Sequence, residues 1–374
     1  MSLNLSEIRR DFHRHPEIAF EEKRTSRIIS ELLRSIGLEP KFCAGTGVTA
    51  ELCGAQPGPT IAFRVDIDAL PIEEIAMVAY ASMIPGKMHA CGHDLHAAIG
   101  LGVAEALIKR QQELRGNIKF LFQPAEEVLN GAKAMIAEGI LEGVSVIFGF
   151  HNKPELPVKS VAFTQGSVMA ASDRFKIMIE GMGGHGAAPH KTKDPVVASA
   201  GIIMGLQTAV SRILDPTEPV VVSICSLHGG SAFNVIPHHV ELEGTVRYLS
   251  PEIGRVMPGI LADISENIAK GYRCSAKLEY TELVVPLVNS PELSDLAKRT
   301  AVKVLGKEAV VFSESIMASE DFSEYLKYVP GCYFWLGSGG EHGFHHPAYC
   351  VDERCMDVGV NVLTEILVEA LKQG

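Results

Sequence analysis

Cysteines are few in this sequence, and none of them is paired in a CxxC pattern. Eight cysteines are spread over 374 residues, a density far below that of small secreted domains held together by disulfide bonds. The spacing also lacks the paired motifs of structural zinc sites and thiol oxidoreductases. We therefore expect reduced thiols and a cytoplasmic location.

Long apolar runs and an excess of basic residues are missing as well. No apolar run approaches the ~18 residues that span a bilayer, and the first residues, MSLNLSEIRR, lack the apolar segment of a secretory signal. Lysine and arginine number 34 against 45 for aspartate and glutamate, which gives a net charge of −11. We therefore expect neither nucleic acid nor a membrane among the partners.

The remaining composition is that of a folded protein. Hydrophobic residues make up 47% of the chain and charged residues 21%, which excludes a disordered or fibrous protein. A chain of 374 residues is too long for one ordinary core. Its length predicts two domains, or one large domain with an insertion.

Short apolar runs alternate with helical patterns in the first part of the chain, which is typical of an α/β domain with a mainly parallel sheet. The same alternation of apolar runs and helical patterns resumes beyond residue 285, so residues 1–172 and 285–374 are predicted to form one domain. In such sheets the chemistry collects at the carboxyl ends of the strands. The apolar runs lie at 60–65, 117–122 and 144–150, and the helical patterns at 96–114 and 132–138.

Residues 173–284 have a different pattern, in which apolar and polar residues alternate as they do in half-buried antiparallel strands. The order of elements is βαββαβ, which favours a smaller ferredoxin-like α+β domain inserted into the larger one. The predicted strands are 173–180, 219–227, 239–248 and 274–280, and the predicted helices are 194–213 and 251–270.

The densest group of metal-binding residue types lies just before the long helical pattern, in the segment Met88–His96. Imidazole and thiolate ligands suit Zn²⁺, Ni²⁺ or Co²⁺, and carboxylates extend the range to Mn²⁺. Cys91 and His93 can point the same way if the backbone between them is extended. The helix N-terminus that follows should favour the Cys91 thiolate. Alternatively, the segment is a capped helix start with incidental histidines.

Further ligand-type side chains follow two other predicted strands. The strand 117–122 runs into the adjacent carboxylates Glu126 and Glu127, and the strand 144–150 ends at His151. Near the C-terminus, His345 and His346 lie in a glycine- and aromatic-rich loop. Adjacent buried carboxylates are costly without a cation, although acidic pairs are often solvated. Spacing alone does not decide which carboxylate or which histidine binds, but the pattern favours a binuclear metal site.

With these residues in view, the chain resembles the M20 metallopeptidase family, and within it the amidohydrolase branch of N-acyl-amino-acid deacetylases, hippurate hydrolases and auxin-conjugate hydrolases. The motifs occur in the family's order and span nearly the whole chain. They are RVDIDALP at 64–71, HACGHD at 89–94, QPAEE at 123–127, GFHN at 149–152, GGHGAAPH at 183–190, SEDF at 319–322 and HHP at 345–347.

The resemblance implies a centre of two divalent metal ions per subunit, with Zn²⁺, Mn²⁺, Ni²⁺ and Co²⁺ as candidates. Cys91 matches the bridging ligand, and Glu126 matches the general base that activates a metal-bound water. The residues that match the terminal ligands are His93, Glu127, His151 and His345.

In the smaller domain, His185 matches the donor that stabilises the oxyanion, and Asn234 and Arg247 match positions that contact the substrate carboxylate. Asp66 and Asp68 follow the predicted strand 60–65, where carboxylates often orient ligand histidines. Relatives commonly dimerise through the smaller domain. We therefore expect it to act as a lid and dimerisation domain in a homodimer.

The sequence predicts a metal-dependent hydrolase that cleaves the amide bond of small N-acyl amino acids and releases the free amino acid. N-acetyl amino acids are the expected substrates. A dipeptidase or aminopeptidase of the same fold is the alternative within hydrolases. The alternatives from other classes are a non-catalytic amino-acid or peptide binder and a redox or metal-buffering thiol protein.

Overall fold

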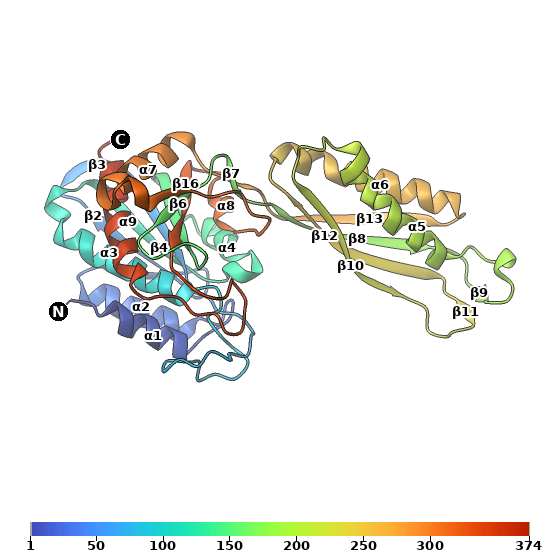
Figure 1. The fold of residues 1–374 in the computed structure, drawn as a ribbon, viewed down its shortest axis with the longest axis horizontal. Coiled ribbons are helices and arrows are strands. Elements are labelled where there is room, and N and C mark those ends of the chain that lie inside the picture. The colour runs from blue at the N-terminus through green and yellow to red at the C-terminus, as the bar shows by residue number, and fades with distance from the viewer. Residues whose placement is uncertain (1, 374) are drawn as a thin grey trace. The chain divides into compact units, whose positions relative to one another are not determined.

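The computed structural model describes residues 2–373, and Figure 1 shows their arrangement as two compact units. The first unit comprises the chain up to Val168, Val288–Glu314 and the chain from Asp321 onward. The second comprises Met169–Leu287 and Ser315–Glu320. The six-residue segment Ser315–Glu320 falls within the range that the sequence places in the larger domain.

The first unit is built on an eight-stranded sheet in the order β1-β2-β4-β3-β5-β16-β6-β15. Strand β3 pairs in parallel with β4 and β5, and β16 pairs in parallel with β5. This confirms the predicted α/β class. The strands are β1 (Lys41–Cys43), β2 (Gly47–Cys53), β3 (Gln56–Asp66), β4 (Arg115–Gln123), β5 (Val144–Lys153), β6 (Val161–Phe163), β15 (Val310–Phe312) and β16 (Gly331–Gly337).

Helix α3 forms the centre of the helical layer because it is apolar on all sides. It packs against α1, α2 and α9 and against strands β3 and β4. A Cβ on Gly100 would lie 2.9 Å from Val65 Cγ2, so this glycine lets the helix approach the sheet closely. The helices are α1 (Leu5–Arg14), α2 (Lys23–Ser35), α3 (His93–Lys109), α4 (Gly131–Ala137), α7 (Pro291–Leu305), α8 (Phe322–Tyr325) and α9 (Cys355–Leu371), with 3-10 turns η1 (Gln111–Glu113), η2 (Glu126–Val128) and η5 (Lys307–Ala309).

The parallel pairing places the carboxyl ends of three neighbouring strands at one edge of the first sheet. Strand β3 ends at Asp66, β4 runs to Gln123 just before the turn that holds Glu126, and β5 carries His151 near its end. Helix α3 begins at His93. The elements of the first unit thus bring the ligand-type side chains predicted from the sequence to the same edge.

The second unit is a four-stranded antiparallel sheet, ordered β10-β12-β8-β13, with two helices. This strand order is that of a ferredoxin-like βαββαβ fold. Its elements are β8 (Ser172–Glu180), η3 (Pro189–Lys191), α5 (Pro195–Thr208), the π-helical turn η4 (Ala209–Ile213), β10 (Val220–Gly229), β12 (His239–Tyr248), α6 (Pro251–Gly271) and β13 (Ser275–Val284). Two short ribbons pair β9 (Gly184–His185) with β11 (Val235–Ile236) and β7 (Ser167–Met169) with β14 (Leu287–Val288).

One helical stretch has the length and apolar character of a membrane span. It is Pro195–Ile213, with a mean hydropathy of 1.5, and 28% of it is buried within the protein. Ala198, Ile202 and Leu206 on this stretch belong to the core of the second unit. The core helix of a soluble protein has the same features, so this stretch is weak support for a membrane span.

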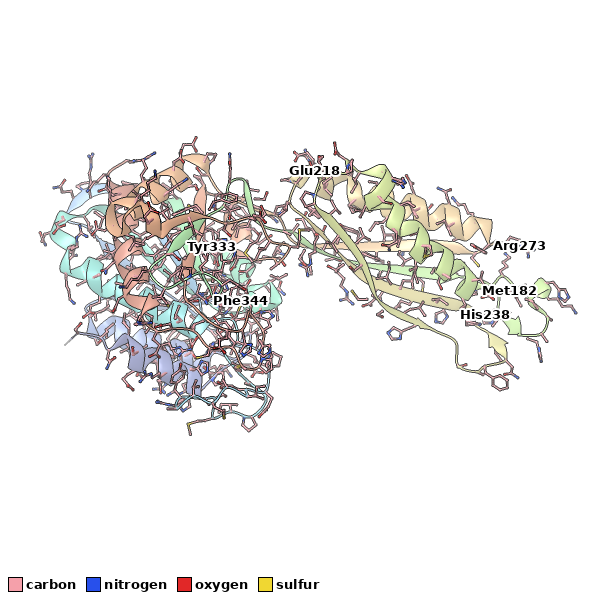
Figure 2. The ribbon with its side chains drawn as sticks, viewed as in Figure 1. Met182, Glu218, His238, Arg273, Tyr333 and Phe344 are labelled. Carbon is pink, nitrogen blue, oxygen red and sulfur yellow. The ribbon has the colours of Figure 1, made fainter. Side chains whose placement is uncertain are left out.

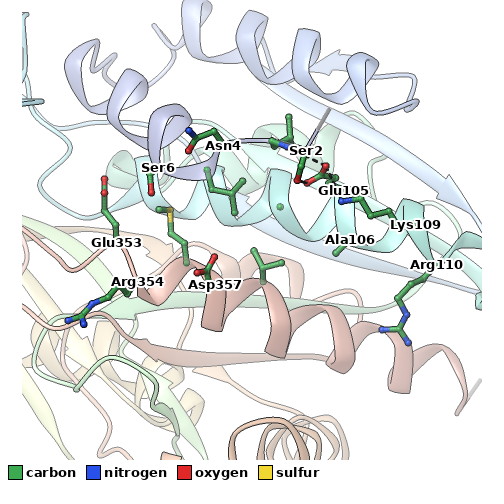
Figure 3. Close-up of a pocket in the computed structure, with 15 residues that line it drawn as sticks. Ser2, Asn4, Ser6, Glu105, Ala106, Lys109, Arg110, Glu353, Arg354 and Asp357 are labelled. Atoms are coloured by element: carbon green, nitrogen blue, oxygen red, sulfur yellow. Dashed lines mark hydrogen bonds and ion pairs between the residues drawn. The ribbon is translucent and has the colours of Figure 1, made fainter.

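A surface cavity of about 870 Å³ lies beside the start of α1 (Figure 3). Its wall comes from the first residues of the chain and from α3 and α9, and it carries charges of both signs such as Glu105, Lys109 and Asp357. None of the predicted site residues lines this cavity.

Candidate metal centre

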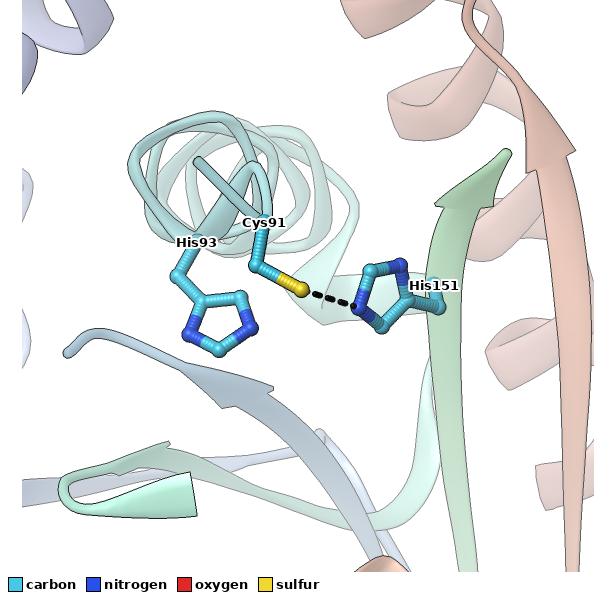
Figure 4. Close-up of side chains that lie close together, drawn as sticks. All are labelled: Cys91, His93 and His151. Carbon is cyan, nitrogen blue, oxygen red and sulfur yellow. Dashed lines mark hydrogen bonds between the residues drawn. The ribbon is translucent and has the colours of Figure 1, made fainter. Parts of the chain in front are cut away.

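Three potential metal ligands from two elements meet beside the start of α3. Figure 4 shows Cys91, His93 and His151 pointing toward one another. Their ligand atoms all lie within 4.8 Å of one another, and Cys91 Sγ is 3.4 Å from His151 Nε2. All three side chains are buried, so a cation between them would be shielded from water.

A second group shares Cys91 with the first. Cys91, Glu127 and His345 place one ligand atom each within 4.8 Å of one another. His345 Nε2 lies 3.3 Å from Glu127 Oε2, and His93 Nε2 lies 4.0 Å from Glu127 Oε1. A further group, also within 4.8 Å, contains His93, Glu126 and Glu127. The five residues predicted as ligands therefore lie together, and Cys91 belongs to the first two of these groups.

Gly92 sets the geometry between Cys91 and His93. Its φ of 92° lies in the left-handed region, so the extended backbone that would point both side chains the same way is not present. A Cβ at this position would lie 2.4 Å from Asn152 Oδ1 and 2.7 Å from the Tyr349 hydroxyl. Only glycine fits, and His93 reaches Cys91 from the first turn of the helix.

The turn after β4 presents the two adjacent carboxylates. Ala125 has φ 54° and lies in the left-handed region just before η2, which contains Glu126 and Glu127. The N–H of Glu127 donates to Asp68 Oδ2 at 3.0 Å. A Cβ on Gly131 would lie 1.7 Å from the Pro124 carbonyl oxygen, so the chain closes tightly behind the turn. Glu126 itself is buried.

The local charges explain why this cluster favours a cation. Burial alone would lower the pKa of His93, but the carboxylates of Asp66, Asp68 and Glu127 raise it to about 10. Burial and the neighbouring carboxylates raise the pKa of the Cys91 thiol well above its usual value. In the metal-free site, burial and these carboxylates therefore outweigh the help that the helix N-terminus gives to the thiolate. A thiolate at Cys91 needs compensating positive charge.

Two buried ligand atoms in the cluster have no hydrogen-bond partner among the described residues. They are His93 Nε2 and Glu127 Oε1, and they face each other at 4.0 Å. Buried polar atoms are rarely left unsatisfied. Together with a thiol, imidazoles and carboxylates, they form a donor set that fits a borderline divalent cation.

The carboxylates at the end of β3 contact histidines, but not in the same way. Asp68 Oδ1 lies 3.1 Å from His93 Nδ1, which leaves His93 Nε2 directed at the cluster. Asp66 Oδ1 lies 2.5 Å from His96 Nδ1 and 3.8 Å from His93 Nε2. On its other side, Asp66 forms an ion pair with Arg64, whose Nη1 lies 2.7 Å from Asp66 Oδ2. Asp68 thus orients His93, whereas the close partner of Asp66 is His96.

The two histidines of the C-terminal loop have different surroundings. The backbone N–H of His345 donates to the Ala90 carbonyl at 2.9 Å, and its ring faces Glu127. His346 accepts from the N–H of Ala348 at 3.0 Å and stacks on His342, with the ring centroids 4.1 Å apart. The structure therefore places His345, and not His346, with the ligand cluster.

The remaining predicted residues, His185, Asn234 and Arg247, lie in the second unit. His185 on β9 is exposed, and the N–H of the following Gly186 donates to the Asn234 carbonyl at 2.8 Å. Arg247 lies near the other end of β12, is half-buried, and donates to Ser319 Oγ at 2.6 Å. Figure 2 labels His238 and Glu218 near these opposite ends. Within one chain, the structure does not bring Asn234 and Arg247 together.

Several residues that the sequence analysis missed support the cluster. His96 contacts Asp66 and, through Nε2, Asn152 at 2.8 Å. Glu22 reaches the turn before Glu126 from the start of α2. His13 is buried, with Nδ1 2.8 Å from Asp94 Oδ2. Only His96 and Asn152 carried a signal, because they lie in or beside motifs, and periodicity does not reveal the long-range contacts of Glu22 and His13.

Glu22 provides a pH-dependent stability prediction. Burial raises the pKa of Glu22 from 4.5 to about 7. A shift of this size changes the free energy of unfolding by about 3 kcal/mol at most. Because the folded-state pKa is raised, this stability is present below the unfolded pKa and is lost as the pH rises through about 7. We expect urea unfolding of metal-free wild type to show this loss between pH 4.5 and 7.5 relative to Glu22→Gln. A constant difference between the two proteins would contradict it.

Comparison with known proteins identifies the family. Residues 62–369 match the profile of peptidase family M20/M25/M40, so the chain belongs to this family. The match includes every predicted ligand and Glu126.

Among its relatives, N-acetylcysteine deacetylase from Bacillus subtilis is 40% identical over 372 residues, covering 98% of this chain and 97% of that protein. Thermostable carboxypeptidase 2 from Saccharolobus solfataricus is 38% identical, covering 94% and 92%. The crystal structure of the Bacillus subtilis YXEP protein, described as a dinuclear metal-binding peptidase of the M20 family, superposes with a TM-score of 0.90 at 38% identity, covering 98% of both chains.

Proposed function

We propose that this protein is a metal-dependent amidohydrolase that cleaves the amide bond of small N-acyl amino acids, foremost N-acetyl amino acids, and releases the free amino acid. The observation that carries the proposal is the pair of ligand groups that share Cys91. Family membership supports the reaction class, and the similarity to an N-acetylcysteine deacetylase supports the acetyl group.

The ligand assignment follows the two groups. Cys91 would bridge two divalent ions, with His93 and His151 completing one site and Glu127 and His345 the other. When bound, such ions lower the pKa of a coordinated water and polarise the amide carbonyl. The similar dinuclear metal-binding peptidase supports two ions, and Zn²⁺, Mn²⁺, Ni²⁺ and Co²⁺ all suit these donors.

Glu126 is proposed as the general base. It is buried and adjacent to Glu127, in the turn η2 that follows β4. Its carboxylate would take a proton from the attacking water and deliver one to the leaving amine, the usual base-then-acid cycle. The N–H of the neighbouring Glu127 donates to Asp68, and its carboxylate groups with Cys91 and His345, which supports a ligand role for Glu127.

The second unit is proposed to bind the substrate and to act as a lid. His185 would donate to the oxyanion. Asn234 or Arg247, which one chain does not bring together, would bind the substrate carboxylate, for which a guanidinium is well suited. The exposure of His185 and Asn234 supports this role, since both are accessible to a ligand.

A substrate panel tests the function. N-acetyl, N-benzoyl and dipeptide substrates are offered to protein loaded in turn with Mn²⁺, Zn²⁺, Co²⁺ and Ni²⁺, and amino-acid release is measured with Glu126→Gln as the blank. We expect release from the N-acetyl class that the blank lacks. If protein with two bound ions released no amino acid from any substrate in the panel, a non-catalytic binder would be favoured.

Cleavage of peptides is the second candidate, favoured by the similarity to a carboxypeptidase. The same panel separates the two activities, because a peptidase would prefer the dipeptides. A redox-active thiol protein is less well supported, since the raised pKa of Cys91 makes the metal-free thiol a poor nucleophile.

We propose further that the protein is a cytoplasmic homodimer. On α5 the side chains of Val196, Val197 and Met204 are exposed, and exposed apolar patches often mark contacts between proteins. The eight cysteines are free, which suits a reducing compartment. Light scattering should give twice the chain mass of 40.4 kDa, and a monomer would overturn the dimer.

A further inference from the structure

Glu22 is a fully buried carboxylate that contacts the turn before the two adjacent glutamates. It precedes α2 but makes no side-chain cap to that helix. Its Oε1 accepts the N–H of Ala125 at 2.9 Å, and its Oε2 accepts the hydroxyl of Thr46 at 2.5 Å. Both carboxylate oxygens of Glu22 therefore accept hydrogen bonds, one from the turn at Ala125 and one from Thr46, although Glu22 is far from both in the sequence.

The N–H that Glu22 accepts belongs to a strained residue. Ala125 is buried and left-handed, with φ 54° and ψ 38°. This conformation is costly for a residue with a Cβ and persists only where its surroundings hold it. Ala125 is directly followed by Glu126 and Glu127, so a change in its backbone angles would move both carboxylates.

Glu22 is itself held in place. Ser26 Oγ donates to the Glu22 carbonyl at 2.6 Å and contacts the Thr46 carbonyl. Burial, together with the charge of Asp68, raises the pKa of Glu22 to about 7. Near neutral pH both protonation states are therefore populated, and either state retains an oxygen that can accept the Ala125 N–H.

We propose that Glu22 is a positioning residue: through its hydrogen bond to the Ala125 N–H, it fixes the turn that presents Glu126 and Glu127. This inference rests on the proposed function for its catalytic consequence. Glu22 acts through the turn and touches no reacting atom. Loss of the acceptor should therefore lower kcat more than it changes KM.

Three variants test the role, each assayed beside wild type. Glu22→Ala removes the acceptor, and Glu22→Gln keeps an amide oxygen that can accept the same N–H. Glu17→Ala is the matched control, because the Glu17 carboxylate accepts the N–H groups of Arg24 and Thr25 at the start of the same helix and bonds to no residue of the turn. Metal content and thermal unfolding are measured for every variant.

We expect Glu22→Ala to lower kcat about 10- to 100-fold with KM little changed, as for a misplacement of about 1 Å. Glu22→Gln and Glu17→Ala should stay within about threefold of wild type on this scale. A Glu22→Ala variant with wild-type kcat would overturn the proposal. So would a Glu22→Gln or Glu17→Ala variant that is as impaired as Glu22→Ala.

Amide hydrogen exchange of residues 123–129 provides a readout independent of turnover. The Ala125 amide should exchange faster in Glu22→Ala and unchanged in Glu22→Gln and Glu17→Ala. Unchanged exchange in Glu22→Ala would overturn the positioning role. If wild type hydrolyses nothing in the panel, the proposed function fails, and the exchange measurement still decides whether Glu22 fixes the turn.

Discussion

Glu126→Gln should bind two metal ions per chain, as wild type does, and hydrolyse N-acetyl amino acids about 10²- to 10⁴-fold more slowly, the range for loss of a general base. The amide has nearly the same shape as the carboxylate but cannot take a proton from water. Metal content by elemental analysis and kcat on the same preparation measure both parts of the prediction.

The matched control is Glu127→Gln at the adjacent position. Glu127 groups with Cys91 and His345, so this variant should lose metal as well as activity. Glu126 also lies close to His93 and Glu127, so comparing the metal content of the two variants is needed to show whether Glu126 is itself a ligand. If Glu126→Gln lost an ion, Glu126 would be a ligand, and if it retained near-wild-type turnover, it would not be the base.

Cys91→Ala is expected to have the second large effect. Because Cys91 belongs to both ligand groups, its removal should weaken the binding of both ions by at least about 100-fold, more than typical losses from supporting residues. Removing His151 should weaken mainly one ion. Competition with a chelator measures the affinities, and activity should fall in parallel.

The exposed thiol of Cys53 supplies the control. Cys53→Ala removes a cysteine far from the cluster in the sheet, and its metal content should equal that of wild type. A Cys91→Ala protein that retains two tightly bound ions would show that Cys91 is not a shared ligand.

Much of the fold could be predicted because it follows from local patterns. The apolar runs at 60–65, 117–122 and 144–150 lie within β3, β4 and β5, and the parallel pairing brings their carboxyl ends together. Alternation similarly located the four strands of the second sheet. The segment Ser315–Glu320 was not predicted in the second unit, since only tertiary contacts place it there.

The site was predictable in its residue types and less so in its geometry. The left-handed backbone at Gly92 could not be predicted, and neither could the contacts with Asn152 and Tyr349 that leave no room for a Cβ there. The direction of the Cys91 pKa depended on burial and on carboxylates that tertiary contacts bring close to the thiol. Glu22 was missed because its contact with Ala125 joins residues that are 103 positions apart.

The most direct test of the central claim is a metal titration of the metal-free protein. Mn²⁺ or Zn²⁺ is added in known equivalents while bound metal and release of amino acid from an N-acetyl substrate are measured together. A dinuclear centre predicts no turnover without metal and a plateau at two ions per chain. Full activity in the metal-free protein, or a plateau at a single ion, would contradict the account.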